Sequence, residues 1–427
     1  MTNTTGTRPG PYDMLQANRL FAQATKLLEA NDAMAAMPLL QSCLRLNPRH
    51  YKAVRAVAAI AMQNDASAQG RDILQDFFQS YPIRLNRARH LGKRPSLLSI
   101  RGFSETEVIP WRSGAGAVST MFRGGHFSAK YLIANPKFAE HVYTIARGNI
   151  LQPGALPDFN LMLNKIADPD VESESLIALQ TYLAHHPGTP VINHPGKVLK
   201  TTRDANYQRL KDRPGVQFPQ THRVTFDKAD ADMVAATISR LGLDGGPVIL
   251  RATGTHTART TALIRTRADI EAYVGDTALS GPHYLIRYIE LLWQGDYFRK
   301  LRLFNIDGTL YPTVCHIDQT WNVHGGNRKD MMRDNNALMD EEKRFLLDWR
   351  SYVGADNADR LEALIDEVGL EFFGIDFNVG PDGVLIYEMN AAMRHSFDHA
   401  KNFPYKMPFD LMITQAFSDM ITRRLAA

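Results

Sequence analysis

The stretch Phe373–Val379 (FGIDFNV) is followed by Pro381-Asp382-Gly383 and then by Val384–Asn390 (VLIYEMN). Both stretches are rich in the aromatic and β-branched residues that strands favour, and the Pro-Asp-Gly between them is a tight-turn sequence. The pattern predicts a β-hairpin with three polar side chains, Asp376, Glu388 and Asn390, set among apolar ones.

These three side chains form the candidate metal site. Side chains two positions apart on a strand point to the same face, so Glu388 and Asn390 share a face, and a short hairpin can bring Asp376 opposite them. Two carboxylates and an amide oxygen suit Mg²⁺, and burying carboxylates without partners is costly. The alternative is a hairpin whose polar face meets solvent.

Upstream of this hairpin, short apolar runs alternate with helical patterns. Four runs are strand candidates and Ser173–His185 is an amphipathic helix candidate; the runs are Leu97–Ile100, Tyr131–Ala134, Phe159–Ile166 and Pro190–Asn193. Alternation of this kind predicts a parallel α/β domain, which we place at residues 96–195. Four further helices are expected in residues 196–427: one after Thr202 through Leu210 and beyond, and others at Glu341–Tyr352, Ala358–Val368 and Phe409–Leu425.

Residues 11–82 have apolar positions at helical spacing and repeat with a period of 34, since Leu39, Leu40, Leu44 and Pro48 recur as Ile73, Leu74, Phe78 and Pro82. This pattern resembles the tetratricopeptide repeat, and the alternative is two unrelated helical hairpins. The basic residues of positions 83–95 indicate a solvated linker. The repeats could serve a protein or peptide partner, or contacts between two copies of the chain.

The composition excludes several classes. The chain has 427 residues, a net charge of +4 and no dense Lys/Arg run, so nucleic acid is not an expected partner. Cys43 and Cys315 lack metal or disulfide-framework spacing. Residues 1–10 have no apolar signal core, and no apolar run approaches the roughly 20 residues that cross a bilayer. We therefore expect a cytoplasmic protein without a membrane segment.

The Asp…Glu-x-Asn pattern resembles the magnesium signature of ATP-grasp enzymes such as glutathione synthetase. Other segments resemble that family's motifs in the same order: Val191–Pro195, Gly215–Thr221, Val248–Arg251, Gly254–Thr261, Tyr284–Glu290, and Lys300–Arg302 with Asn305–Gly308. The resemblance implies a multidomain α + α/β fold. Helical repeats would precede a Rossmann-like pre-ATP-grasp domain at 96–195 and an ATP-grasp α+β domain of two lobes at 196–427.

The resemblance also assigns roles, with ATP and Mg²⁺ as cofactors. Arg203 and Arg251 stand where the family keeps phosphate-binding lysines, and Arg302, with Lys300, would steady the transferred phosphate. The loop residues Thr255, His256 and Thr257 would cover the phosphates, although this loop is poor in glycine. The adenosine would be held by a hinge segment: Arg287, Tyr288, Ile289 and Glu290.

Five further residues are expected on the substrate side: His316, Trp321, His324, Arg394 and His395. A packing role for Trp321 and a surface role for Arg394 are open alternatives. The implied activity is a carboxylate–amine ligase that works through an acyl phosphate on small-molecule or peptide substrates. The alternatives are a phosphotransferase on the same fold and an inactive nucleotide-binding scaffold. Family analogy favours a homodimer.

Overall fold

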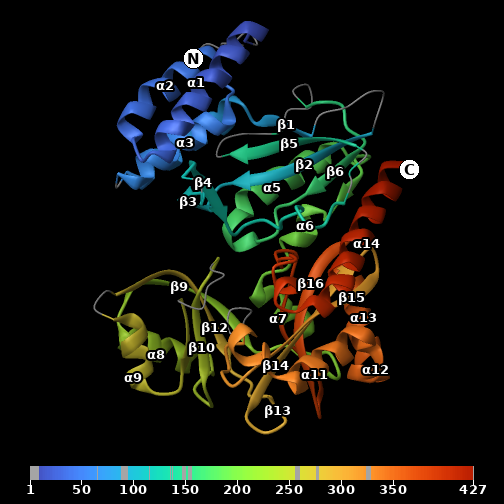
Figure 1. The fold of residues 1–427 in the computed structure, drawn as a ribbon. Coiled ribbons are helices and arrows are strands. Elements are labelled where there is room, and N and C mark those ends of the chain that lie inside the picture. Colours follow the sequence, from blue (N-terminus) through green and yellow to red (C-terminus); the bar gives the residue numbers. More distant parts are fainter. Residues whose placement is uncertain are drawn as a thin grey trace. The chain divides into compact units, whose positions relative to one another are not determined.

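The computed structural model describes residues 9–64, 66–87, 95–114, 116–134, 136, 138–146, 151, 156–254, 260–275, 278–323 and 328–426. The chain divides into two compact units (Figure 1). The first contains Met1–Leu85, Gly102–Arg123 and Val142–Leu156, and the second contains Asn86–Arg101, Gly124–His141 and Pro157–Ala427.

The first unit begins with four helices, α1 (Pro11–Glu29), α2 (Ala33–Leu46), α3 (Tyr51–Gln63) and α4 (Ser67–Ser80). Small buried side chains such as Ala17, Ala24 and Ala36 let the first helices pack closely. The expected helical content of residues 11–82 is therefore confirmed. The tetratricopeptide resemblance stays a prediction.

A hairpin of β3 (Glu107–Arg112) and β4 (Val118–Arg123) packs on α3 in the same unit. Arg55 of α3 donates from Nε to Thr120 Oγ1 at 3.2 Å and also to the Thr120 carbonyl. The sequence analysis did not predict this hairpin.

A five-stranded sheet has the order β1-β5-β2-β6-β7, formed by Ile83–Arg87, Ala139–Ala146, Ser96–Phe103, Leu161–Asn164 and Val191–Ile192. β6 runs parallel to β2 and to β7, and α5 (Pro169–His185) connects β6 to β7. Three of the four expected strands are therefore confirmed. The fourth is wrong, because Tyr131–Ala134 forms no strand. Strand β1 lies in the range expected to be a linker.

An antiparallel sheet of order β11-β10-β12-β9 follows, formed by Thr261–Ile264, Val248–Ala252, Leu279–Arg287 and Thr221–Ala229. Helices α8 (Ala231–Arg240) and α9 (Arg267–Val274) cover its apolar core, which includes Leu250, Leu285 and Val234. Arg251 and Tyr284 are paired neighbours on β10 and β12.

The last sheet has the order β13-β14-β16-β17-β8, with β15 added beside β14. Its strands are Leu292–Trp293, Tyr297–Ile306, Phe372–Gly380, Gly383–Asn390, Val216–Gln217 and, for β15, Thr309–Asp318. The predicted C-terminal hairpin is β16 and β17, and its register sets Asp376 opposite Glu388.

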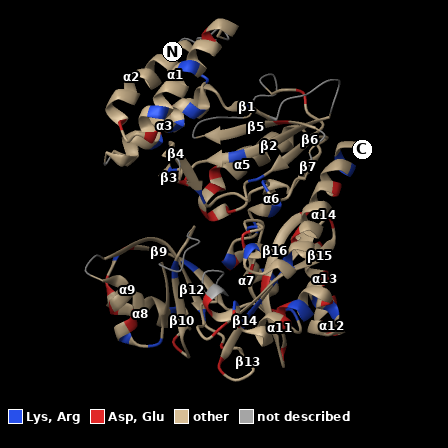
Figure 2. Cartoon of the chain, viewed as in Figure 1, with Lys and Arg blue, Asp and Glu red and all other residues tan. Residues whose placement is uncertain are grey.

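The remaining helices of the second unit are α6 (Pro195–Val198), α7 (Arg203–Leu210), α10 (Arg328–Met332), α11 (Asn336–Leu347), α12 (Trp349–Val353), α13 (Ala355–Val368) and α14 (Met407–Ala426). The single helix expected over Glu341–Tyr352 is two helices, because Asp348 leaves helical geometry and caps α12 by accepting from Ser351 N at 3.1 Å. Among the described residues no helix is long and apolar enough to cross a membrane. Basic and acidic residues are both dispersed over the elements, in keeping with the small net charge (Figure 2).

Candidate active site

The β16–β17 hairpin carries the two carboxylates of the candidate site. Asp376 is 2% exposed, and its register partner Glu388 lies on the neighbouring strand. Asn390 Nδ2 donates to Glu388 Oε1 at 2.8 Å, which agrees with the prediction that these two side chains share a face. The Asn390 Oδ1 atom accepts from Ala392 N at 2.8 Å.

Arg302 on β14 forms a two-point ion pair with Asp376. Its Nε and Nη2 atoms donate to Oδ1 and Oδ2 at 2.6 and 2.8 Å, and Lys300 Nζ lies 3.5 Å from Oδ2. Burial acts to raise the pKa of Asp376, but the charges of Arg302 and Lys300 outweigh it, and the pKa lies below its ordinary value. Asp376 is therefore ionised at neutral pH.

Arg203 is the first residue of α7, where Thr202 caps the helix by accepting from Ala205 N at 3.3 Å. Arg203 Nη2 lies 2.8 Å from Glu388 Oε1, and Nη1 donates to the Tyr387 carbonyl at 2.9 Å. The helix start thus fixes a guanidinium against the carboxylate of β17.

Arg251, at the end of β10, lies close to this guanidinium. The charge of Arg203, followed by burial, lowers the pKa of Arg251 to about 10, and Glu388 and Asp168 act in the opposite direction. Arg251 therefore stays cationic at neutral pH. Two like charges held this close form a place where a bound anion would be stabilised.

A cavity of about 890 Å³ brings the predicted residues together. Its lining includes seven of the predicted nucleotide- and metal-site residues: Arg203, Arg251, Lys300, Arg302, Asp376, Glu388 and Asn390. A smaller neighbouring pocket contains Arg203, Arg251, Tyr284, Glu388 and the start of α5. Thr255, His256 and Thr257 lie outside the described residues.

The hinge segment after β12 is held by its backbone. Arg287 N donates to Gln220 O at 2.8 Å, and Tyr288 N donates to Pro247 O at 2.9 Å. Burial and the charge of Glu290 raise the pKa of Tyr288 to about 12. Ile289 follows Tyr288 in this segment. The next residue, Glu290, has its Oε1 atom 3.9 Å from Arg265 Nη2.

The predicted substrate residues separate into three groups. His316 and Arg394 line the cavity; the His316 ring lies 5.5 Å from that of His399, and Arg394 Nη2 lies 2.5 Å from Asp398 Oδ2. Trp321 instead packs edge-on against Tyr288, with ring centroids 6.0 Å apart. His324 lies outside the described residues.

His395 is not brought to the cavity. It is 2% exposed, its Nε2 lies 3.2 Å from Thr414 Oγ1, and burial, with help from the charge of Lys406, lowers its pKa to about 4. A neutral imidazole packed against α14 has no surface left for a substrate. The structure thus corrects the prediction that His395 contacts substrate.

The sequence analysis missed a buried polar network beside Arg251. The hydroxyl of Tyr284 donates to Asp170 Oδ2 at 2.8 Å and accepts from Arg223 Nη2 at 2.9 Å, and Arg223 also pairs with Asp170. Asp170 is 114 residues from Tyr284, so no local pattern could have linked them. Lys406, which lines the cavity, was missed for the same reason.

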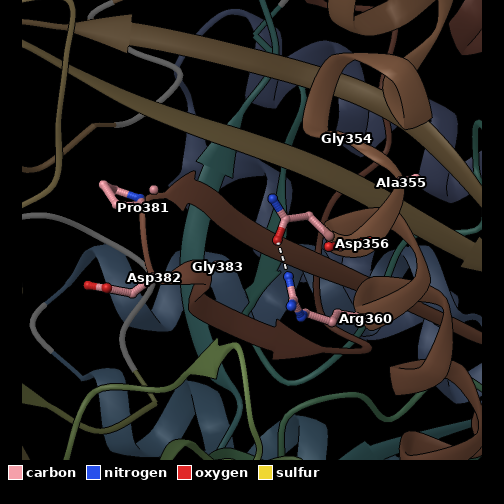
Figure 3. Close-up of a pocket in the computed structure, with 9 residues that line it drawn as sticks. Gly354, Ala355, Asp356, Arg360, Pro381, Asp382 and Gly383 are labelled. Carbon is pink, nitrogen blue, oxygen red and sulfur yellow. Dashed lines mark hydrogen bonds between the residues drawn. The ribbon is translucent and has the colours of Figure 1, made fainter.

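A separate cavity of about 470 Å³ lies beside the turn of the β16–β17 hairpin (Figure 3). It is lined by Asp356, Arg360, Asp382 and small residues, and Arg360 Nη1 donates to Asn357 Oδ1 at 2.8 Å. None of the predicted site residues lines it, so we do not consider it part of the candidate site.

No family model and no curated protein matches the chain. Its structure is similar to those of ATP-grasp ligases. A RimK-domain ATP-grasp protein from Sphaerobacter thermophilus is 18% identical, with a TM-score of 0.39 over 66% of this chain and 90% of that one. A D-alanyl-alanine synthetase A from Vibrio cholerae is 12% identical, with a TM-score of 0.43 over 78% of this chain and 100% of that one.

A D-Ala:D-Ser ligase from Enterococcus faecalis gives 11% identity and a TM-score of 0.42, over 78% of this chain and 100% of that one. All three TM-scores lie below 0.5. The function proposed below therefore rests on the residues of this chain.

Proposed function

We propose that the chain is an ATP-dependent carboxylate–amine ligase of the ATP-grasp type. One observation carries the proposal: Arg203, Arg251 and Arg302 line the same cavity as Asp376, Glu388 and Asn390. Three guanidiniums can bind the oxygens of a triphosphate in pairs, and the carboxylates and amide are oxygen donors of the kind Mg²⁺ accepts. The proposal extends to the domain organisation. Tetratricopeptide-like repeats would occupy residues 11–82 and a linker residues 83–95. A pre-ATP-grasp domain at 96–195 and a two-lobed ATP-grasp domain at 196–427 would follow.

The donor set fits Mg²⁺ by its chemistry. Asp376 is ionised, Glu388 is opposite it, and both carboxylates are at present paired with cationic side chains, which is how buried carboxylates are stabilised. The amide oxygen of Asn390 would be the third donor of the set; among the described residues no group of three or more His, Cys, Asp or Glu could hold a metal ion. Asp376, Glu388 and Asn390 would hold the cation, which offsets phosphate charge when bound.

The protein's own part in the reaction is positioning and charge stabilisation. A substrate carboxylate oxygen attacks the γ-phosphorus of ATP, the bond to the β-phosphate oxygen breaks, and ADP leaves. An amine nitrogen then attacks the acyl carbon, loses a proton, and displaces phosphate. Arg302 and Lys300 stand beside Asp376, where they can hold the transferred phosphate, while Arg203 and Arg251 hold the other phosphates.

His316 and Arg394 also line the cavity and are proposed to contact the substrates. The hinge residues Arg287 to Glu290 are proposed to bind the adenosine, with Thr255, His256 and Thr257 over the phosphates. Small-molecule or peptide substrates, a cytoplasmic location and a homodimer also belong to the proposal.

The test is ADP release with Mg·ATP across a panel of carboxylates and amines. Hydroxylamine is included as the amine because it converts an acyl phosphate into a hydroxamate. We expect amine-dependent ADP release and hydroxamate formation, both lost in Glu388→Gln and both kept in Glu362→Gln, a half-exposed residue of α13 paired with Arg350. ADP release that needs no amine and leaves a stable phosphorylated product would contradict ligation.

A further inference from the structure

The first unit carries a cluster of arginines stacked on tyrosines, well apart in sequence from every residue of the proposed active site. Arg84 of β1 lies over the Tyr51 ring at 4.7 Å, and Arg55 of α3 lies over the same ring at 5.3 Å. Arg49 lies over Tyr81 at 5.3 Å. Tyr51 and Tyr81 both contact Phe77, so one aromatic cluster supports all three guanidiniums.

The charges in this cluster are not balanced within the described part of the unit. Arg55 and Arg84 share one ring, and burial, with the charge of Arg84, lowers the pKa of Arg55. The described residues supply no carboxylate partner to Arg49, Arg55 or Arg84. Arg84 Nε is buried and has no hydrogen-bond partner among the residues that the structure describes. Such donors cost free energy unless something accepts from them.

Arg71 shows what a satisfied arginine looks like in the same unit. It also lies over an aromatic ring, that of Phe103, at 4.9 Å. Its Nη1 donates to the Thr106 carbonyl at 2.7 Å, and its Nη2 donates to the Ser104 carbonyl. Arg84 has the same stacking, but the described residues offer it no such acceptors, so its guanidinium is the one of the two that a ligand could satisfy.

Arg55, like Arg71, has acceptors, since its Nε and Nη2 donate to Thr120. We propose that Arg84 and Arg49, with the charge of Arg55 beside them, form a binding site for an acidic peptide segment. Guanidinium groups pair with carboxylates through two parallel hydrogen bonds, and adjacent Asp or Glu side chains would meet adjacent arginines. Nucleobases are disfavoured because one ring, that of Tyr51, is already covered by two guanidiniums, and because a net charge of +4 is small for a nucleic-acid protein.

The test is fluorescence anisotropy with the full chain and a fluorescein-labelled hexaglutamate peptide. We expect salt-sensitive binding that Arg84→Gln weakens by roughly fivefold to tenfold and that Arg84→Lys restores only in part, because lysine keeps the charge but not the two-point geometry. Arg19→Gln makes the same charge change at an exposed position of α1 and is expected to bind normally. The thermal midpoint of each variant checks that it is folded.

Three results would overturn the proposal. The first is equal affinity for hexaglutamate and hexaglutamine, or no binding of either peptide. The second is an equal loss of affinity in Arg84→Gln and Arg19→Gln, which would indicate only general charge attraction. The third is tighter binding of a hexathymidylate oligonucleotide, which would assign the site to nucleic acid. None of these outcomes depends on the ligase activity.

Discussion

Asp376 and Arg302 form a two-point ion pair in the wall of the cavity. Removing either side chain leaves the other as an unpaired charge, which lowers the stability of the fold. We predict that Asp376→Asn abolishes ADP release and lowers the free energy of unfolding at neutral pH by about 2–4 kcal/mol, because Arg302 and Lys300 lose their counter-charge. The predicted loss of stability allows for the 20% exposure of the Arg302 side chain. Urea unfolding of the wild type and the variant measures this difference in free energy.

The same variant has a predictable pH dependence. The folded-state pKa of Asp376 is depressed, so its stabilisation is complete above the ordinary carboxyl value of 3.8 and is lost as the pH falls through the lower folded-state pKa. The unfolding curves of the wild type and Asp376→Asn should therefore converge on acidification. Asp359→Asn, which removes an exposed partner of Arg350, is the control and should change stability by roughly 0–1 kcal/mol. A constant gap between wild type and Asp376→Asn at every pH would contradict the assignment.

Arg251 offers a second test at the residue scale, because it is held beside Arg203 in the absence of an anion. We predict that Arg251→Gln leaves the thermal midpoint of the nucleotide-free protein unchanged or slightly raised, since a like-charge contact disappears. The rise in midpoint that ATP gives the wild type should be lost. A variant that is destabilised without ATP, yet keeps the full ATP-dependent rise, would show that Arg251 is structural.

At the scale of elements, three side chains connect α5 to β12 and β9: Asp170, Tyr284 and Arg223. This contact sets the surroundings of Arg251, since Tyr284 is its paired neighbour. We predict that Tyr284→Phe, which removes one buried hydroxyl, weakens ATP binding by roughly fivefold to tenfold. AMP binding should be unchanged, because AMP lacks the outer phosphates. Equal losses for ATP and AMP in calorimetry would indicate a general structural defect instead.

The C-terminal hairpin could be predicted because turn residues and strand propensity agree within eighteen residues, and the structure places Asp376 opposite Glu388 as expected. The start of α7 at Arg203 was likewise near the expected position. Sequence reasoning could not link Asp170 to Tyr284 or bring Lys406 to the cavity, because those neighbours are set by packing between distant elements.

Tyr131–Ala134 shows why an apolar run alone was not enough. The Tyr131 carbonyl accepts from Thr414 Oγ1 at 2.6 Å, and the Tyr131 ring lies 5.3 Å from that of Phe397. Leu132 is buried, and its carbonyl accepts from Ser418 at 3.2 Å. The run is apolar because it packs under α14, and periodicity cannot distinguish such a loop from a buried strand.

At the scale of the whole molecule, the chain combines a candidate active-site cavity in the second unit with an arginine cluster in the first. The proposed functions of the two units are chemically compatible, because a ligase for peptide substrates gains from a site that holds an acidic peptide segment. Linking two binding events on one chain raises the effective concentration of the second partner. Each function nevertheless has its own test.

The central claim is that the cavity binds ATP together with Mg²⁺. Isothermal titration calorimetry of the full chain with ATP, with and without Mg²⁺, tests it most directly, with Glu388→Gln and Glu362→Gln run in parallel. We predict that Mg²⁺ increases the affinity for ATP in the wild type and in Glu362→Gln. In Glu388→Gln this Mg²⁺-dependent increase in affinity should be smaller by at least about tenfold. Absence of ATP binding in the wild type, or a Mg²⁺ effect that survives in Glu388→Gln, would contradict the claim.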